Sequence, residues 1–600
     1  MDKIAVLDFG GQYAHLIANR IRRLNVYSEI LDGETPASEL KEYKGIILSG
    51  GPQSVYDKDA LKCDPEILNL GVPLWGVCYG HQLLAELQDV EIKHDPEAKE
   101  YGLTQMEVKS AEGIFKGLAP QETVWMSHGD IVAELPEGYT GLGSTRGGEW
   151  AAIGNLNRHF YGVQFHFEVT HTKSGMKMLE NFLDICGVAK EWKIESYVNQ
   201  KVEDIKTQVG DGKVFMLVSG GVDSTVAFML LVKALGPERV YGLFVDTGFL
   251  RLNERDQVES SLKSAGFENL HVKDAGDVFY EALKEVYDPE KKREIIGDMF
   301  INVQEQVVKE LNLNPDEWLL GQGTIYPDTI ESGGTKNSAK IKTHHNRVPQ
   351  IEELMQKGKI IEPLADLYKD EVRQVGEILG LPEEMVWRHP FPGPGLAVRC
   401  LCTNKEDYPI NREPLEKHIN DTLKVTGLTA ALLPLQSVGV QGDFRTYRHP
   451  LAIVGETNFD QLDVIATQLI NQNSEINRVI WMLEPRKIKK MFVSNSYLTP
   501  ERIELLQKAD DVVNNFVKEN ELTREIWQFP VVLIPLTINA RGGESIVLRP
   551  VESEEAMTAN FYHMDRDLLN RLAHDLKRIR GITAVFYDVT NKPPGTIEWE

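Results

Sequence analysis

One short loop restricts this chain to a parallel α/β fold. Residues 219–225 read Ser-Gly-Gly-Val-Asp-Ser-Thr, between an apolar run at 214–218 and a helical run at 226–232. The apolar run predicts a buried parallel strand. A turn of small residues between a strand and a helix directs backbone N–H groups and the positive end of the helix at an anion. This order predicts a phosphate-binding loop, with an ordinary turn of small residues as the alternative.

Asp223 sets this loop apart from the common phosphate loop, which ends in Gly-Lys-Ser/Thr. A carboxylate beside a phosphate repels it unless a cation lies between them, so Asp223 predicts bound Mg²⁺. The loop resembles that of the N-type ATP pyrophosphatases, which cleave ATP between its α and β phosphates and adenylate a substrate oxygen. The resemblance implies that ATP is bound by Ser219, Gly220, Gly221, Val222, Asp223, Ser224 and Thr225.

A cysteine far upstream lies in a second distinctive turn. Gly76-Val-Cys78-Tyr-Gly80 is the thiol form of the Gly-x-Ser-x-Gly elbow, whose small neighbours permit a strained strand-to-helix turn. Such a turn exposes the sulfur at a helix N-terminus, where the helix dipole favours the thiolate. A lone cysteine in an apolar run is more often an inert core residue, but the two glycines favour a nucleophile.

Two further segments supply partners for this thiol. His166 and Glu168 are two residues apart, so on a strand they share a face and Glu168 can orient His166. Taken alone, His166 would be interpreted as a satisfied histidine at a strand end. Ser49-Gly-Gly51-Pro follows the predicted strand 45–48 and offers free N–H groups to an oxyanion, with a plain turn as the alternative.

These segments resemble the class I, triad-type glutamine amidotransferases over about the first 190 residues. Motifs at 8–12, 48–52, 101–102 and 126–130 fall in the order of that family. The resemblance implies Cys78 as nucleophile, His166 as base, Glu168 as orienter, Gly51 as oxyanion donor, and Gln82, Ser127 and His128 as glutamine-binding residues. Departures from the family are His81 at a usually apolar site, Phe167 in place of a proline, and Lys99 where arginine is common.

The alternation of strands and helices predicts two parallel-sheet α/β domains, over 1–190 and 191–403. A polar helical stretch at 190–212 marks the boundary between them. In the second domain Asp246 ends a predicted strand, at the edge where doubly wound sheets bind nucleotides, although a solvated loop acid is an equal alternative. An α+β region is predicted over 404–600.

This last region carries a weak internal repeat. A β-β-α-β series runs through 437–454, 460–470 and 478–483, and a similar series runs through 544–550, 568–579 and 583–589. The pattern predicts a duplicated α+β unit. The charged helical stretch at 487–525 is predicted to be an insertion between the two copies.

Composition limits the classes of protein to which the chain belongs. Its formal charge of −25 argues against nucleic-acid binding, which needs clustered Lys and Arg. No apolar run approaches the length of a membrane span, and the first residues run directly into a strand, which leaves no room for a signal peptide. The five cysteines show neither metal-ligand spacing nor a disulfide framework. We therefore expect a cytoplasmic enzyme with small-molecule substrates and no membrane partner.

Motifs in the second half extend the resemblance to the whole chain. Segments 322–328, 389–396, 440–443 and 592–599 match the glutamine-hydrolysing GMP synthetases, which convert xanthosine monophosphate (XMP) to GMP. The resemblance implies that ATP adenylates the C2 oxygen of XMP and that ammonia from glutamine then displaces AMP. It places XMP at Arg293, Asp443, Gln528, Lys592 and Glu598. The loop around 342–345 is a candidate lid.

Three alternatives remain open at this point. The region after residue 403 resembles the long form of the family, whose duplicated unit could replace a contact between chains, so both monomer and homodimer are possible. A rival enzyme would adenylate a deamido-dinucleotide, for which the segment 592–598 is not needed. A nucleotide-sensing protein with the same fold predicts broken catalytic positions, whereas Cys78, His166 and Asp223 are present.

Overall fold

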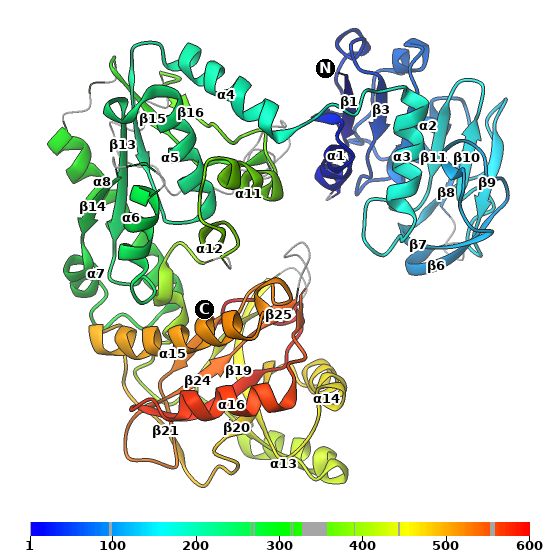
Figure 1. Ribbon diagram of the computed structural model, residues 1–600. Coiled ribbons are helices and arrows are strands. Elements are labelled where there is room, and N and C mark those ends of the chain that lie inside the picture. The colour runs from blue at the N-terminus through cyan, green and yellow to red at the C-terminus, as the bar shows by residue number, and fades with distance from the viewer. Residues whose placement is uncertain are drawn as a thin grey trace. The chain divides into compact units, whose positions relative to one another are not determined.

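The computed structural model describes residues 2–11, 13–94, 99–264, 266–267, 270–311, 314, 316–326, 357–388, 391–441, 444–552 and 559–600 (Figure 1). Contacts divide the chain into two compact units. The first consists mainly of Met1–Gln200, and the second consists of Lys201–Ile325 and Lys342–Glu600.

A nine-stranded sheet forms the first unit, in the order β2-β1-β3-β4-β11-β10-β9-β6-β7. Its strands are β1 Lys3–Asp8, β2 Tyr27–Asp32, β3 Gly45–Leu48, β4 Leu74–Val77, β6 Glu100–Val108, β7 Gln121–His128, β9 Thr140–Ser144, β10 Ala152–Asn155 and β11 Phe160–Val163. The strands from β2 to β11 run parallel, as predicted, and the remaining pairs are antiparallel.

Helices flank this sheet because its parallel strands are apolar on both faces. Strands β3, β4 and β11 are buried along their whole length, which requires cover on each side. Helix α2 (Tyr79–Glu86) packs on β4 and β11, and α1 (Ala14–Arg23) packs on β1 and β2. The unit is completed by α3 (Gly175–Cys186) and by the short strands β5 (Ile92–His94) and β8 (Asp130–Val132).

The second unit begins with a five-stranded parallel sheet, in the order β14-β13-β12-β15-β16. The strands are β12 Lys213–Leu217, β13 Val240–Asp246, β14 Leu270–Asp274, β15 Trp318–Gly321 and β16 Ile360–Ile361. Helix α4 (Ile194–Val209) spans the boundary between the two units. The other helices are α5 Val222–Leu235, α6 Glu254–Ser264, α7 Gly276–Ala282, α8 Pro289–Leu311, α11 Lys369–Ile378 and α12 Glu383–Val386. The parallel arrangement predicted from the sequence is confirmed.

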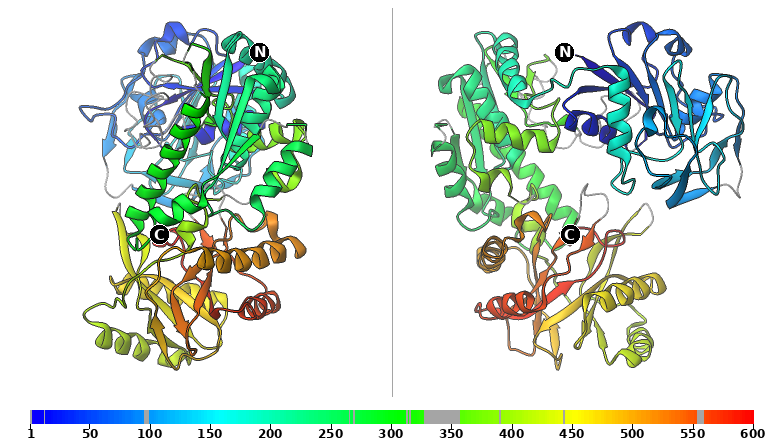
Figure 2. Two further views of the ribbon diagram at one scale, coloured as in Figure 1. Left: turned by 90° about the vertical axis from the view of Figure 1, so that its left-hand side faces the viewer. Right: turned by 45° about the vertical axis from the view of Figure 1, so that its right-hand side comes forward.

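A seven-stranded sheet completes the second unit, and its strand order is symmetric. The path β17-β19-β20-β27-β24-β22 has parallel pairs β19–β20 and β24–β27, with the antiparallel pair β20–β27 at the centre. Helix α14 (Phe459–Gln472) connects β19 (Phe444–Val454) to β20 (Ile476–Glu484). In the same way α16 (Arg566–Lys577), drawn in red in Figures 1 and 2, connects β24 (Glu544–Leu548) to β27 (Ile582–Asp588). The repeated β-β-α-β pattern in the sequence therefore corresponds to two similarly connected halves of one sheet.

The two faces of this sheet have different covers. One face packs on α13 (Arg412–Leu423), α14, α15 (Pro500–Glu519) and α16. The other face packs on Trp599 of the C-terminal segment and on Leu401, Leu433 and Leu435. The remaining strands are β17 Thr429–Leu432, β18 Ser437–Gln441, β21 Met491–Val493, β22 Val531–Ile534, β23 Leu536–Ile538, β25 Val551–Glu552 and β26 Asn560–Phe561. Figures 1 and 2 show the C-terminus between the two sheets of this unit.

A buried charged cluster holds the C-terminal segment on this sheet. Arg478 of β20 and Arg549 both contact Asp588 at the end of β27, at 2.9 and 3.1 Å, and all three side chains are fully buried. Arg478 Nη2 also donates to the backbone carbonyls of Thr596 and Glu598. In the described part of the chain, no helix is long and apolar enough to cross a membrane.

Candidate active sites

Strand β4 and helix α2 present Cys78 at a sharp turn. Cys78 has φ 51° and ψ −104°, a conformation that L residues rarely adopt. Glycine is required on both sides, because a Cβ on Gly76 would lie 2.3 Å from the Gly80 carbonyl oxygen and one on Gly80 would lie 2.2 Å from that of Leu48. The Cys78 N–H donates to the carbonyl of Val163 at 2.8 Å. The thiol is thereby fixed at the N-terminal end of α2.

His166 and Glu168 form a buried pair beside Cys78. His166 Nδ1 lies 2.6 Å from Glu168 Oε1. Both His166 and Cys78 lie against Gly50, where an added Cβ would meet the His166 ring at 3.0 Å and the Cys78 Cβ at 3.8 Å. Burial acts to lower the pKa of His166, but Glu168 and Cys78 outweigh it and raise that pKa well above its ordinary value. The arrangement stabilises an imidazolium next to the thiol.

The prediction that this pair lies on a strand is wrong. Strand β11 ends at Val163; beyond it His166 forms only an isolated antiparallel bridge to Trp125, and Glu168 lies in a bend. The His166 N–H donates to the Trp125 carbonyl at 3.0 Å, and the Thr172 hydroxyl donates to the His166 carbonyl at 2.6 Å. These bonds fix the segment, so the two side chains meet without the alternation of a strand.

The loop after β3 lies next to the elbow. The Gly80 N–H donates to the Ser49 carbonyl at 3.0 Å. A Cβ on Gly51 would lie 2.9 Å from the Phe9 carbonyl oxygen, so the chain passes too closely here for a side chain. Among the residues that the structure describes, the N–H groups of Gly50 and Gly51 have no acceptor. They are available to an oxyanion beside Cys78.

The three candidate glutamine-binding residues have different surroundings. The carbonyl of Ser127 lies 3.6 Å from the Cys78 sulfur. Gln82 is buried and donates to the Asp130 carbonyl at 2.9 Å. His128 is also buried, and its Nε2 lies 3.6 Å from Glu100 Oε2. The structure therefore brings Ser127 directly to the thiol, while His128 faces Glu100.

Gln164 is a contact of the thiol that the sequence did not reveal. Its Nε2 lies 3.8 Å from the Cys78 sulfur, and its Oε1 accepts a hydrogen bond from Gln82 Nε2 at 3.4 Å. Gln164 follows β11 directly, and β11 pairs with β4 in parallel register, so it reaches the same sheet edge as Cys78. Gln164 lies next to Cys78 because β11 pairs with β4, and this pairing cannot be deduced from the sequence alone.

Two of the three departures from the family pattern are packing residues. His81 of α2 is fully buried, and burial lowers its pKa to about 3, so the ring is neutral near pH 7. A Cβ on Gly162 of β11 would lie 2.2 Å from His81 Nδ1, so the ring occupies the space above that glycine. Phe167 stacks on Trp75 with the ring centroids 4.0 Å apart. Lys99 directly precedes β6.

The loop between β12 and α5 is closed by its own hydroxyl groups. The Ser219 N–H donates to Ser224 Oγ at 3.0 Å, and the two hydroxyl oxygens are 2.9 Å apart. Ser224 Oγ also lies 3.2 Å from the Gly221 carbonyl. Helix α5 begins at Val222, earlier than the predicted helical run, so Asp223 lies in its first turn. The loop and the helix N-terminus together form an anion-binding geometry.

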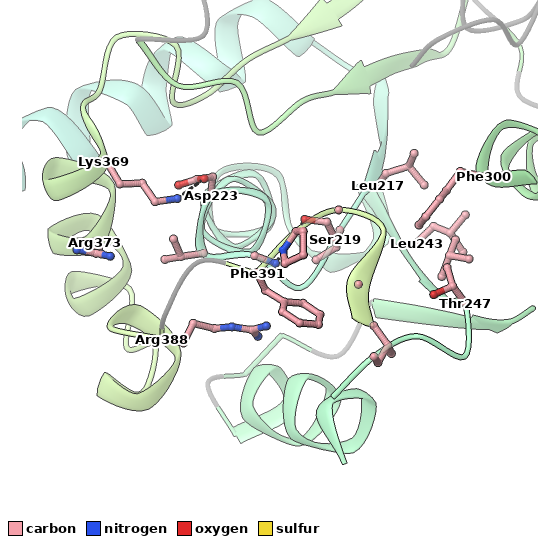
Figure 3. Close-up of a pocket in the computed structure, with 18 residues that line it drawn as sticks. Leu217, Ser219, Asp223, Leu243, Thr247, Phe300, Lys369, Arg373, Arg388 and Phe391 are labelled. Atoms are coloured by element: carbon pink, nitrogen blue, oxygen red, sulfur yellow. Dashed lines mark hydrogen bonds and ion pairs between the residues drawn. The ribbon is translucent and has the colours of Figure 1, made fainter. Parts of the chain in front are cut away.

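Asp223 has one paired and one unpaired carboxylate oxygen. Lys369, at the start of α11, points toward Asp223 in Figure 3 and forms an ion pair with its Oδ2. Oδ1 is buried and has no hydrogen-bond partner among the described residues. Within that same part of the chain, no group of three or more His, Cys, Asp and Glu side chains could hold a metal ion. A lone buried carboxylate oxygen fits Mg²⁺ that takes its other ligands from substrate phosphates and water.

A cavity of about 370 Å³ opens at this loop. Cationic side chains of Lys369, Arg373 and Arg388 line it together with Phe391, and Figure 3 shows them around Ser219 and Asp223. Arg388 Nη1 donates to the carbonyl of Gly220 at 2.9 Å. Arg388 directly precedes the family motif at 389–396, whereas the sequence gave no signal for Lys369 or Arg373. These cations supply locally the positive charge that an acidic chain needs to bind polyphosphate.

Asp246 lies at the predicted sheet edge, and its carboxylate accepts a hydrogen bond from the loop that follows it. It ends β13, and its Oδ1 accepts a hydrogen bond from the Gly248 N–H at 2.9 Å. Gly323, which follows β15, approaches the phosphate loop closely, since a Cβ there would lie 2.9 Å from the Cα of Ser224. The carboxyl ends of β13, β12 and β15 therefore meet around one site.

The candidate purine-binding residues lie along the C-terminal segment. Gln528 Nε2 is 3.5 Å from Glu598 Oε1. Arg293 of α8 donates to the backbone of Glu600 and, at 2.8 Å, to Glu290. Burial and the nearby Arg549 lower the pKa of Lys592. The structure thus brings Gln528 and Glu598 together and places Arg293 at the end of the same segment. Asp443 and the predicted lid at 342–345 lie outside the described residues.

Three family models match successive parts of the chain. Residues 5–186 match glutamine amidotransferase class-I, 192–293 match NAD synthase, and 515–599 match the GMP synthase C terminal domain. The chain is 46% identical to a probable glutamine-hydrolysing GMP synthase of Leptospira interrogans, over 100% of this chain and 99% of the relative. It is 44% identical to the glutamine-hydrolysing GMP synthase of Aquifex aeolicus over 80% of this chain and 96% of the relative. It is 38% identical to the glutamine-hydrolysing GMP synthase of Thermobifida fusca, over 100% of this chain and 98% of the relative.

Proposed function

Because the chain belongs to the family of glutamine-hydrolysing GMP synthases, we propose a division of the synthesis of GMP between the residues of its two sites. The first unit hydrolyses glutamine at Cys78. The second unit binds ATP at the loop 219–225 and XMP along the C-terminal segment. The observation that carries this proposal is the buried His166–Glu168 pair, 2.6 Å apart, beside a thiol held in a strained elbow.

In the first site the Cys78 thiolate attacks the side-chain amide carbon of glutamine, which is held by Gln82, Ser127 and His128. The N–H group of Gly51 stabilises the oxyanion. His166, kept cationic by Glu168, transfers its proton to the departing nitrogen, and the C–N bond breaks to release ammonia. A water molecule, deprotonated by His166, then attacks the thioester and releases glutamate.

In the second site the C2 oxygen of XMP attacks the α-phosphorus of ATP. The bond to the bridging oxygen breaks, and pyrophosphate departs toward the loop 219–225 and the cations of Lys369, Arg373 and Arg388. Asp223 would hold Mg²⁺, which supplies charge neutralisation for the departing phosphates. Ammonia then attacks C2, and AMP leaves to give GMP.

XMP is favoured over a deamido-dinucleotide as the acceptor. The match to NAD synthase is confined to 192–293, which contains the phosphate loop that both kinds of enzyme need. Gln528 and Glu598, which are in contact, lie in the part matched by the GMP synthase C terminal domain. A purine that presents ring N–H groups is complementary to an amide and a carboxylate at this position.

The proposal is tested by comparing wild type with Cys78→Ala, using XMP, ATP and Mg²⁺ with either glutamine or ammonium. The variant is expected to lose GMP formation from glutamine and to keep GMP formation from ammonium at the wild-type rate, because the thiol acts only on glutamine. Loss of both activities would contradict the assignment of Cys78 to glutamine hydrolysis alone. Failure of the wild type to form GMP from either source would refute XMP as the acceptor.

A further inference from the structure

Arg399 is a buried cation that the reaction outlined above does not use. Its side chain has no solvent exposure, and it makes a forked contact with Glu598. Nη2 lies 2.8 Å from Oε1, and Nε lies 3.1 Å from Oε2. Two parallel N–H···O bonds fix the plane of a carboxylate as well as its position. The Glu598 side chain is 21% exposed, so a ligand can reach its carboxylate, whereas the Arg399 guanidinium is covered by protein.

The guanidinium also has an unused donor. Arg399 Nη1 is buried and has no hydrogen-bond partner in the part of the chain that the structure describes. Buried donors without acceptors are uncommon in proteins, and they often mark a place where a ligand or water completes the set. Here the free nitrogen belongs to the group that holds Glu598.

The segment that carries Arg399 begins in the ATP cavity. Phe391 lines that cavity, and its ring lies 5.3 Å from the Arg399 guanidinium carbon. Between them, the Leu396 N–H donates to the Phe249 carbonyl at 2.7 Å. A Cβ on Gly395 would lie 2.4 Å from that same carbonyl oxygen, so the backbone is held tightly there. One short, anchored segment therefore connects the cavity wall to Glu598.

We propose that Arg399 is a positioning residue for the adenylation of XMP. It orients the Glu598 carboxylate toward the purine and, through Phe391, sets that carboxylate at a fixed place relative to the bound ATP. The inference rests on the proposed binding of XMP by Glu598. Attack on the α-phosphorus requires the C2 oxygen in line with the breaking bond, so a small rotation of Glu598 misplaces the nucleophile.

Arg251 provides a matched control. It is partly buried, with 16% of its side chain exposed, and it stacks on Phe391 with its guanidinium carbon 4.5 Å from the ring centre. Its carboxylate partner is Asp510 at 3.3 Å rather than Glu598. A substitution of Arg251 disturbs the packing around Phe391 without removing the fork on Glu598.

The test uses the full chain with ammonium as nitrogen source and measures KM for XMP and for ATP. Arg399→Met and Glu598→Gln are each expected to raise KM for XMP about tenfold or more, with KM for ATP changed less than about threefold, because a hydrogen bond to a charged group is lost in both. Combining them is expected to give no further loss. Arg399→Lys, which keeps the charge but not the fork, is expected to recover part of the affinity, and Arg251→Lys is expected to leave KM for XMP unchanged.

The outcomes separate the inference from the proposed function. If Glu598→Gln raises KM for XMP but Arg399→Met does not, the positioning role is wrong. The positioning role is also wrong if the double variant raises KM for XMP by the product of the two single effects. An unchanged KM for XMP in Glu598→Gln would instead remove Glu598 from the XMP site. Should Arg399→Met fail to fold, Arg399→Lys decides, since wild-type KM for XMP in that variant would contradict the inference.

Discussion

Glu168 controls the charge of His166 although it is proposed to make no contact with the substrate. Burial alone would favour the neutral imidazole, and the carboxylate 2.6 Å away reverses that preference. Cys78 adds to the effect and raises the pKa of His166 further. The sequence predicted the identity of both residues, and it predicted their contact for the wrong reason, since they lie beyond the end of a strand.

Glu168→Gln is expected to move the alkaline limb of glutamine hydrolysis to lower pH by about one unit or more. The pKa of His166 is raised in the folded protein, so the proton is retained to high pH and lost only as the pH rises through that pKa. Without the carboxylate, burial dominates and the proton is lost earlier. The check is kcat/KM for glutamine between pH 6 and pH 10, with Glu180→Gln, a partly exposed residue of the same unit, as control. An unmoved limb would show that another group sets it.

Single elements were predicted well where their own residues decide the geometry. The elbow before α2 needs Gly76 and Gly80, because a Cβ at either position would lie 2.2–2.3 Å from a backbone oxygen, and both glycines are visible in the sequence. By contrast, the His81 ring lies against Gly162 of β11 because helix α2 packs on that strand, which is distant in the sequence. His81 therefore appears in the sequence only as an unusual residue, whereas in the fold it is a neutral buried ring.

His81→Leu is expected to reduce the acid sensitivity of the first unit. The pKa of His81 is about 3 when folded and about 6.5 when unfolded. Between these values the unfolded chain binds more protons, so stability falls as the pH drops below about 6.5. At pH 5 this amounts to about 2 kcal/mol relative to pH 7. Urea denaturation at both pH values, followed by loss of glutaminase activity, measures it.

The exposed His159, with φ 58°, is the matched control for this experiment. His159→Asn keeps a residue type that tolerates this conformation, and it should retain the wild-type difference between pH 7 and pH 5. If His81→Leu retains the same difference too, the acid sensitivity arises elsewhere in the unit.

At the scale of the whole molecule, the reaction joins two chemistries assigned to different compact units. Cys78 belongs to the first unit, and the phosphate loop with the C-terminal segment belongs to the second. Ammonia released into water near neutral pH becomes protonated and is then no nucleophile. Efficient synthesis therefore requires that ammonia reach the adenylated purine before it is protonated.

We expect the amide nitrogen of glutamine to enter GMP directly, even against an excess of free ammonium. With ¹⁵N-amide glutamine and unlabelled ammonium near pH 7, mass spectrometry of the product should show GMP carrying mainly ¹⁵N. Cys78→Ala under the same conditions should give unlabelled GMP. Label diluted to the ratio of the two pools would mean that ammonia equilibrates with the solvent before it reacts.

The sequence alone determined the features whose causes are local or periodic. Glycines around Cys78 and within 219–225 specify tight turns by sterics, apolar runs specify buried parallel strands, and the repeated β-β-α-β pattern specifies the symmetric sheet. The tertiary structure decided which distant charges meet. Lys369 pairs with Asp223 across 146 residues of chain, and Arg399 pairs with Glu598 across 199. No local pattern encodes such pairs, because each is fixed by the way strands and helices pack, and for the fully buried Arg399 the low polarity of its surroundings then strengthens the contact.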